Sequence, residues 1–299
     1  MKPLYTYILE ARGIVTGDFD WSDLVETIMS YMPGIEVGKY EIDEKELPSW
    51  LTFLTVEVTP YGEASYEYRQ SRLIGDKMDA YIKIPEGKSQ FWYKLSINHE
   101  LQHAFDDWIA RTRRGRDCGF DDRYCISTGY EYENLEWDRL YDLVTHPGEC
   151  SYDHIFNILS QATYSLNQSE VNAYLREFNI YMNELEKLYK IEWSFNDVLE
   201  HPNNGLNPLI CLNCLWSLKK NINMLDIKDE DWSWVGDAIN EKWTKMFLGH
   251  IITGTGKEVV KKIVDELFKR YGRKVVKRYQ RVLDDHNIEI KEEPEWFKI

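Results

Sequence analysis

The 299-residue sequence has few cysteines and no long apolar run. No apolar segment approaches the roughly 20 residues that a membrane-spanning helix needs, so we expect no contact with a membrane. The opening residues, "MKPLYTYILEARG", contain neither a long apolar region nor a small-residue cleavage site, so we expect no signal peptide. Five cysteines are an odd number for disulfide pairing. Together with the missing signal, they favour reduced thiols and a cytoplasmic setting.

Positive charge is also scarce, because 36 Lys and Arg stand against 51 Asp and Glu, for a formal net charge of −15. This balance disfavours attraction of the whole surface to nucleic acid or to an anionic membrane. Segment 257–283 is the exception, with ten basic and three acidic residues. Its apolar residues recur at helical spacing, so we expect an amphipathic helix with a basic outer face, bent near Gly272. Two interpretations stay open: a solvated face docked on an acidic body, or a contact for nucleic acid or an acidic partner.

The order of patterns predicts an α+β fold, without internal repeats or low-complexity segments. A helix is expected in "DFDWSDLVETIMSYM", and strands in "WLTFLTVEVTP", "ASYEYRQSRLI" and "MDAYIKIP". Short turns between these strands predict an antiparallel meander. Long helices are expected from Ser89 to near Gly115 and from Ser169 to Tyr189. After residues 201–205 the chain is expected to be wholly helical.

The strongest chemical signal is the stretch "SINHELQHAFDDW", which contains His99, Glu100 and His103. Histidines four residues apart lie on one face of a helix and can bind one ion. Zinc lowers the pKa of a bound water, and a neighbouring carboxylate such as Glu100 can take the proton. The alternative is an exposed helix with solvated histidines. Apolar residues spread widely round this helix, however, so we expect it to be buried and its ionisable side chains to need partners.

The segment "INHELQHAF" resembles the extended H-E-x-x-H motif of zincin metallopeptidases, and "MDAYIKIP" resembles their substrate-holding edge strand. The resemblance implies that His99 and His103 bind Zn²⁺ and that Glu100 is the general base. It also implies a zincin-like catalytic domain over 1–195, with a small antiparallel sheet and an active-site helix. A mostly helical region, 196–299, would follow. The implied activity is hydrolysis of a peptide or protein substrate.

A third ligand is needed, because a catalytic zinc usually has three protein ligands. Metzincins have Gly and then His or Asp where this chain has Asp106 and Ile109, and no cysteine precedes Cys118 to serve as in peptide deformylases. Gluzincins take a glutamate from a downstream helix. Glu170 is our candidate, since it shares a helical face with apolar residues, where a carboxylate is costly to bury unless paired or metal-bound. The small residue three positions later, Ala173, also resembles gluzincins.

Alternatives remain for several of these roles. Glu170 with Asn167 could instead form a capping box. Three other glutamates compete as third ligand: Glu131, Glu133 and Glu136. Tyr174 is the candidate donor to a developing oxyanion, or else a core tyrosine. Asp106 and Asp107 could orient an imidazole or form an exposed acidic pair.

The function that we expect is therefore that of a zinc-dependent metallopeptidase. The alternative is a non-enzymatic interaction protein on a zincin-like scaffold, which would bind nucleic acid or an acidic partner through its basic helix at 257–283. Cys211 and Cys214 stand in an apolar helical run without a second cysteine pair, so we expect buried structural thiols there.

Overall fold

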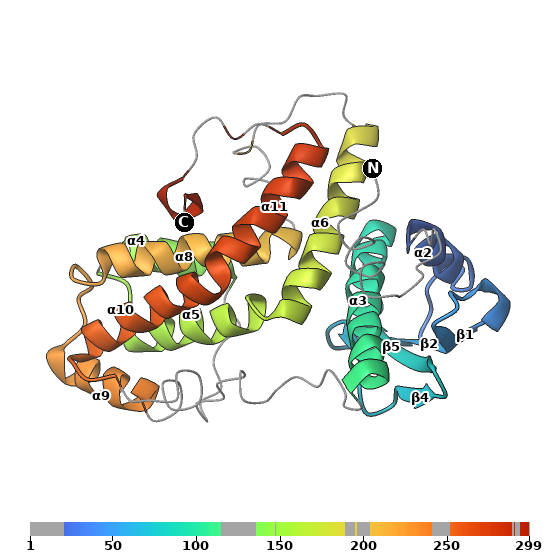
Figure 1. Ribbon diagram of the computed structural model, residues 1–299, viewed down its shortest axis with the longest axis horizontal. Helices are drawn as coiled ribbons and strands as arrows, with labels where there is room; N and C mark the ends of the chain where they lie inside the picture. The colour runs from blue at the N-terminus through green and yellow to red at the C-terminus, as the bar shows by residue number, and fades with distance from the viewer. Residues whose placement is uncertain are drawn as a thin grey trace. The chain divides into compact units, whose positions relative to one another are not determined.

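The computed structural model describes residues 21–114, 136–146, 148–188, 195, 204–240, 252–288, 290 and 294–298. The fold is α+β, with one small mixed sheet and mostly helical content (Figure 1). The chain divides into two compact units, an N-terminal unit of residues 1–117 and a C-terminal unit of residues 118–299. Within the described ranges, none of the helices is both long and apolar enough to cross a membrane.

The N-terminal unit is built on a five-stranded sheet with the order β1-β2-β5-β3, in which β4 also pairs with β5. Strands β2 and β5 are parallel, and the other pairs are antiparallel. The predicted antiparallel meander is therefore wrong. Parallel neighbours need a crossover of about a dozen residues or more, and here residues 60–76 form it. The strands are β1 (Gly38–Ile42), β2 (Leu51–Thr59), β3 (Ser65–Tyr66), β4 (Arg72–Ile74) and β5 (Lys77–Pro85).

The prediction of "MDAYIKIP" as an edge strand is also wrong. These residues lie in β5, which pairs with β2 on one side and with β3 and β4 on the other. The expected single strand "ASYEYRQSRLI" is two short strands, β3 and β4, with a turn between them. The turn is held to the sheet by a side chain, because Ser71 Oγ accepts a hydrogen bond from Tyr81 N–H at 2.9 Å.

One face of the sheet packs against helices α2 (Trp21–Ser30) and α3 (Gln90–Arg114), both of which were predicted. Strand β5 shows why, since its side chains alternate between buried and partly exposed, with the period of two that a half-buried strand requires. Helices α2 and α3 contribute apolar side chains to the same core, and α3 follows β5 directly in the chain (Figure 1). The buried β5 side chains are Met78, Ala80, Ile82 and Ile84, followed by Pro85 at the end of the strand.

The C-terminal unit is helical throughout its described residues (Figure 1). Its helices share one apolar core, which contains side chains from before and after residue 195. Helices before residue 195 therefore belong to the C-terminal unit, and the N-terminal unit, which ends at residue 117, is shorter than the 1–195 domain that we expected. The main helices are α4 (Trp137–Thr145), α5 (Tyr152–Ser165), α6 (Gln168–Leu188), α8 (Asn207–Asn221), α9 (Asp229–Ile239), α10 (Gly256–Leu267) and α11 (Arg273–Asp285).

The basic segment 257–283 forms α10 and α11, joined by a π-helical turn at Phe268–Gly272. The expected amphipathic helix with an irregularity near Gly272 is therefore confirmed. Its apolar stripe is buried, and α10 begins with a capping box in which Thr255 and Glu258 satisfy each other's backbone amides. The buried stripe comprises Val260, Ile263, Val264, Leu267 and Phe268.

Candidate metal site

Helix α3 places the two motif histidines one above the other. The ring centroids of His99 and His103 lie 4.9 Å apart, and the ring planes are inclined at 72°. The side chains are buried, with exposed fractions of 9% and 6%. The alternative of solvated histidines on an exposed helix is therefore wrong. Two buried imidazoles one turn apart can direct nitrogen atoms to a common point, as the i, i+4 spacing predicts.

Around these histidines α3 is buried on more than one side. Apolar residues Ile97, Leu101 and Phe105 belong to the core under the sheet. Polar residues on the remaining sides are buried as well, although burial of polar groups costs free energy unless each has a partner. Helix α3 therefore has a buried polar face beside its buried apolar face. The buried polar residues of α3 are Asn98, His99, Glu100, Gln102, His103 and Asp107.

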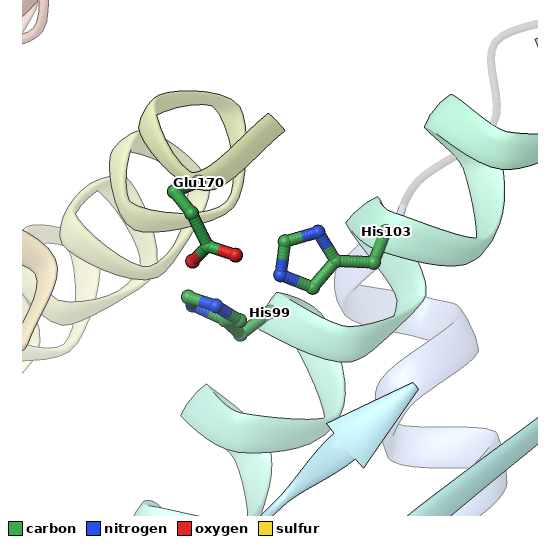
Figure 2. A group of neighbouring side chains, drawn as sticks. All are labelled: His99, His103 and Glu170. Carbon is green, nitrogen blue, oxygen red and sulfur yellow. The ribbon is translucent and has the colours of Figure 1, made fainter. Parts of the chain in front are cut away.

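Glu170 lies in the first turn of α6, and its side chain is fully buried. Figure 2 shows its carboxylate pointing toward both imidazoles. His99, His103 and Glu170 each offer one ligand atom, and these atoms all lie within 4.8 Å of one another. The structure thus brings together the three residues chosen from the sequence, and this buried cluster could hold a metal ion. Two nitrogen donors and one carboxylate oxygen suit a borderline divalent ion such as Zn²⁺.

The residues around Glu170 explain how a carboxylate comes to lie there. Ala173 and Phe178 on the same face of α6 are fully buried, as the apolar stripe predicted. The small Ala173 leaves room along this face. At the start of the helix, Asn167 Oδ1 accepts a hydrogen bond from the backbone N–H of Ser169 at 3.0 Å. The Asn167 side chain therefore caps the N-terminus of α6, which is one half of the capping box considered as an alternative for Asn167 and Glu170.

The competing glutamates fare differently. Glu136 is exposed and occupies the N-cap position of α4, so it is not part of the cluster. Glu131 and Glu133 lie outside the described residues. Among the residues that the structure describes, the cluster of His99, His103 and Glu170 is the one group of three potential ligands found.

Two further candidates are buried near these ligands in the chain. Glu100 follows His99 directly and is 6% exposed, while Tyr174 lies one turn after Glu170 and is 8% exposed. Their roles as general base and oxyanion donor stay predictions. The burial of Glu100 distinguishes it from an ordinary surface carboxylate, because a buried acid needs compensating partners.

Asp107, one turn after His103, anchors a network that the sequence did not reveal. Its side chain is fully buried, so the alternative of an exposed acidic pair is wrong for Asp107. Asp107 Oδ2 accepts a hydrogen bond from Tyr66 O–H at 2.8 Å and forms an ion pair with Arg111 at 2.8 Å. Arg111 also donates to the backbone carbonyls of Ser71 and Tyr68, at 3.2 and 3.3 Å. The network therefore ties α3 to residues 66–71 of the sheet edge.

The electrostatics of this network keep Tyr66 protonated. Burial and the nearby Asp107 carboxylate raise the pKa of the Tyr66 hydroxyl. The hydroxyl therefore keeps its proton at any physiological pH and donates a hydrogen bond to Asp107. The neighbouring Asp106 is half-buried and accepts a hydrogen bond from the Gln102 side-chain amide at 2.7 Å. Tyr66 and Asp107 are separated by 41 residues. No local pattern could have paired them.

The Cys211-x-x-Cys214 pair lies in α8 and does not contribute to a metal cluster among the described side chains. Both thiols are free and fully buried. Burial raises the pKa of each thiol well above its ordinary value. The prediction of buried structural thiols is confirmed.

Comparison of the chain with protein-family models, with curated proteins and with solved structures finds no match. The donor atoms of His99, His103 and Glu170 are what the chemistry must be argued from.

Proposed function

We propose that this protein is a zinc-dependent metallopeptidase in which His99, His103 and Glu170 bind the metal ion. The proposal depends on one observation, that the ligand atoms of these three buried residues lie within 4.8 Å of one another. Three protein ligands with one position left for water or substrate are characteristic of catalytic zinc sites, whereas structural sites have four protein ligands.

The choice of zinc rests on the ligands and on their order in the chain. Two histidines and one carboxylate also bind Fe(II) in non-haem oxygenases. The H-E-x-x-H spacing on a single helix, with a glutamate between the ligands, is instead the arrangement of zinc hydrolases. It supplies both imidazoles and a base from one rigid element, α3.

Zinc, when bound, supplies a Lewis acid that polarises the scissile carbonyl and lowers the pKa of water at the site. The chain's own residues perform the proton transfers. Glu100 accepts the proton of the attacking water and later delivers it to the leaving amine, as a general base and then a general acid. Tyr174 donates a hydrogen bond to the oxygen that gains negative charge. Burial of both residues strengthens these interactions, because the local dielectric is low.

Metal analysis of the purified full-length protein tests the ligand set. We expect about one zinc per chain, as the three-ligand site requires. Glu170→Ala should lose most of this zinc after dialysis against a weak chelator. The matched control is Glu136→Ala, which removes an exposed carboxylate outside the cluster. Equal zinc content in the two variants would refute Glu170 as a ligand, and stoichiometric iron in place of zinc would refute the hydrolase.

The base assignment needs a separate experiment. Zinc-loaded protein is incubated with a pool of synthetic peptides of varied sequence, and cleavage is followed by mass spectrometry. Glu100→Gln should keep its zinc and lose activity by about 10²- to 10⁴-fold, the usual contribution of a positioned base. A Glu100→Gln protein that cleaves as fast as the wild type would contradict the role of Glu100. Absence of cleavage by the zinc-loaded wild type would count against peptidase activity.

A further inference from the structure

The basic residues of segment 257–283 fall into two groups that differ in their partners. On α10 and the π-helical turn, the cations have contacts within the protein. Lys261 donates to Asn223 Oδ1 at 3.1 Å, and Lys262 donates to the carbonyl of Thr253 at 3.0 Å. The remaining cations of that half are similarly engaged: Lys257 lies over the Trp232 ring, and Lys269 and Arg270 pair with Glu266.

On α11 the outer cations make no such contacts. Arg273, Lys274, Lys277 and Arg281 are all exposed, and none forms an ion pair or side-chain hydrogen bond with the part of the chain that the structure describes. The one other cation of this helix, Arg278, is half-buried and donates to Asn172 Oδ1 at 2.7 Å. We call the four exposed residues the α11 basic stripe.

The stripe has a regular geometry because of its spacing. Arg273, Lys277 and Arg281 follow one another at intervals of four, so they form a row along one helical face. Lys274 lies beside this row, within about 100° of Arg273. The row is about 12 Å long, which matches about three to four nucleotides of one DNA strand at about 3.4 Å each.

The composition of the exposed face indicates which anion it fits. Four of the five apolar residues of α11 are buried in the core, namely Val275, Val276, Tyr279 and Leu283, and the fifth, Val282, is partly buried against it. Protein interfaces need an apolar or aromatic centre and are depleted in Lys, and single-stranded nucleic acid needs aromatic side chains for stacking. This face offers neither, since its remaining exposed residues are Gln280, Asp284 and Asp285. The four cations precede the two exposed acids, which lie at the C-terminal end of α11. A row of cations without aromatic neighbours suits the phosphates of a duplex.

We propose that the α11 basic stripe binds the phosphate backbone of double-stranded DNA without reading its sequence. DNA is favoured over duplex RNA because recognition of duplex RNA also uses contacts to the 2′-hydroxyl across the minor groove, whereas the stripe is a single row of cations suited to phosphates. The net charge of −15 does not prevent this. At 0.1 M salt, charges more than about 10 Å away are screened, so the local cations determine the potential that a docked phosphate meets. The proposal is independent of the metal site.

Salt dependence gives the proposal a quantitative test. If all four cations contact phosphates, the slope of log K against log salt concentration is about −3.6, which lowers the affinity about 150-fold between 50 and 200 mM salt. Binding of the full-length protein to a fluorescent 20-base-pair DNA of arbitrary sequence is measured by anisotropy over this range. We expect micromolar affinity at 50 mM salt, equal for unrelated sequences and unchanged by EDTA.

The decisive variant replaces the four stripe residues together with glutamine. We expect its affinity at 50 mM salt to fall at least a hundredfold, because each lost phosphate contact removes a released counterion. The charge-matched control replaces four exposed lysines elsewhere with glutamine, namely Lys39, Lys45, Lys220 and Lys228. The control should keep the wild-type slope. Circular dichroism of both variants should match the wild type, since all eight residues are exposed.

Several outcomes would overturn the proposal. An equal loss in the two variants would show that net charge, and not the stripe, determines binding. Tighter binding to single-stranded DNA or to duplex RNA would contradict the assignment to duplex DNA. Binding to polyglutamate but not to DNA would identify an acidic protein as the partner. Absence of measurable DNA binding at 50 mM salt would leave the stripe a solvated face.

Discussion

The two units of this protein bury polar residues in different ways. Among the described residues of the N-terminal unit, six of the seven buried polar ones lie within ten positions of one helix, Asn98–Asp107 of α3. In the described part of the C-terminal unit, they are spread over α5, α6 and α8. Concentrated polar burial conflicts with the stability of a core, and such conflicts are expected at functional sites. This difference between the units indicates that a functional site is to be sought on α3.

The buried polar residues of the C-terminal unit include ones with an evident structural role. Thr163 donates its hydroxyl proton to the carbonyls of Leu159 and Ser160 one turn earlier in α5, at 3.2 and 2.8 Å. Such a bond satisfies the side chain locally and requires no ligand. The two buried carboxylates found among its described residues are different, and both belong to α6: Glu170 and Glu177. Of these, Glu170 is the one in the histidine cluster.

The largest effect that we predict comes from the buried charge on α3. Asp107→Asn should lower the free energy of unfolding by about 3 kcal/mol, because it removes the charge of a fully buried carboxylate that pairs with the partly buried Arg111 guanidinium at 2.8 Å. Urea unfolding followed by circular dichroism measures the change. The neighbouring Asp106→Asn is the control, with an expected loss below about 1 kcal/mol, since Asp106 is only half-buried. Equal losses of stability in the two variants would mean that the buried position of Asp107 does not make its charge more important than that of Asp106.

The next effect tests close packing in the C-terminal unit. A Cβ added at Gly256 would lie 1.7 Å from the carbonyl oxygen of Trp232, which is backbone and cannot rotate away. Gly256→Ala should therefore push α10 away from α9 and cost about 2 kcal/mol, as overpacking usually does. Thermal unfolding measures it. Gly148→Ala, where a Cβ would meet nothing within 4 Å, should change stability by less than about 0.5 kcal/mol. A harmless Gly256→Ala would show that these helices pack loosely.

The same contrast between the units shows what could be predicted from the sequence. Helix α3 and its histidine pair were predictable because the helical period and the i, i+4 spacing are local. Glu170 could be chosen because a carboxylate on an apolar stripe is conspicuous. The parallel pairing of β2 with β5 was missed, since short turns suggested neighbours in sequence. The pairing of Tyr66 with Asp107 was missed because it depends on chain-distant contacts that no periodicity encodes.

The smallest predicted effect concerns the thiols, of which the N-terminal unit has none, whereas the three described ones of the C-terminal unit are buried. Burial raises the pKa of Cys150 from about 9 to about 12, which lowers the thiolate fraction at neutral pH about a thousandfold. Because the folded state favours the protonated thiol, the stabilisation is present below pH 9 and is lost as the pH rises toward 12. Native Cys150, Cys211 and Cys214 should therefore resist iodoacetamide at pH 8, as measured by mass spectrometry of labelled peptides.

The control for this labelling is the same protein in urea, where the three thiols should react at ordinary rates. Rapid native labelling of Cys211 or Cys214 would contradict the structural role and make the pair a candidate for redox chemistry. Resistance of the native thiols to iodoacetamide, in contrast, would support the difference between the two units. Burial in the apolar surroundings of α8 then keeps the thiols protonated and unreactive, whereas the buried donors His99, His103 and Glu170 lie close enough together to hold a metal ion.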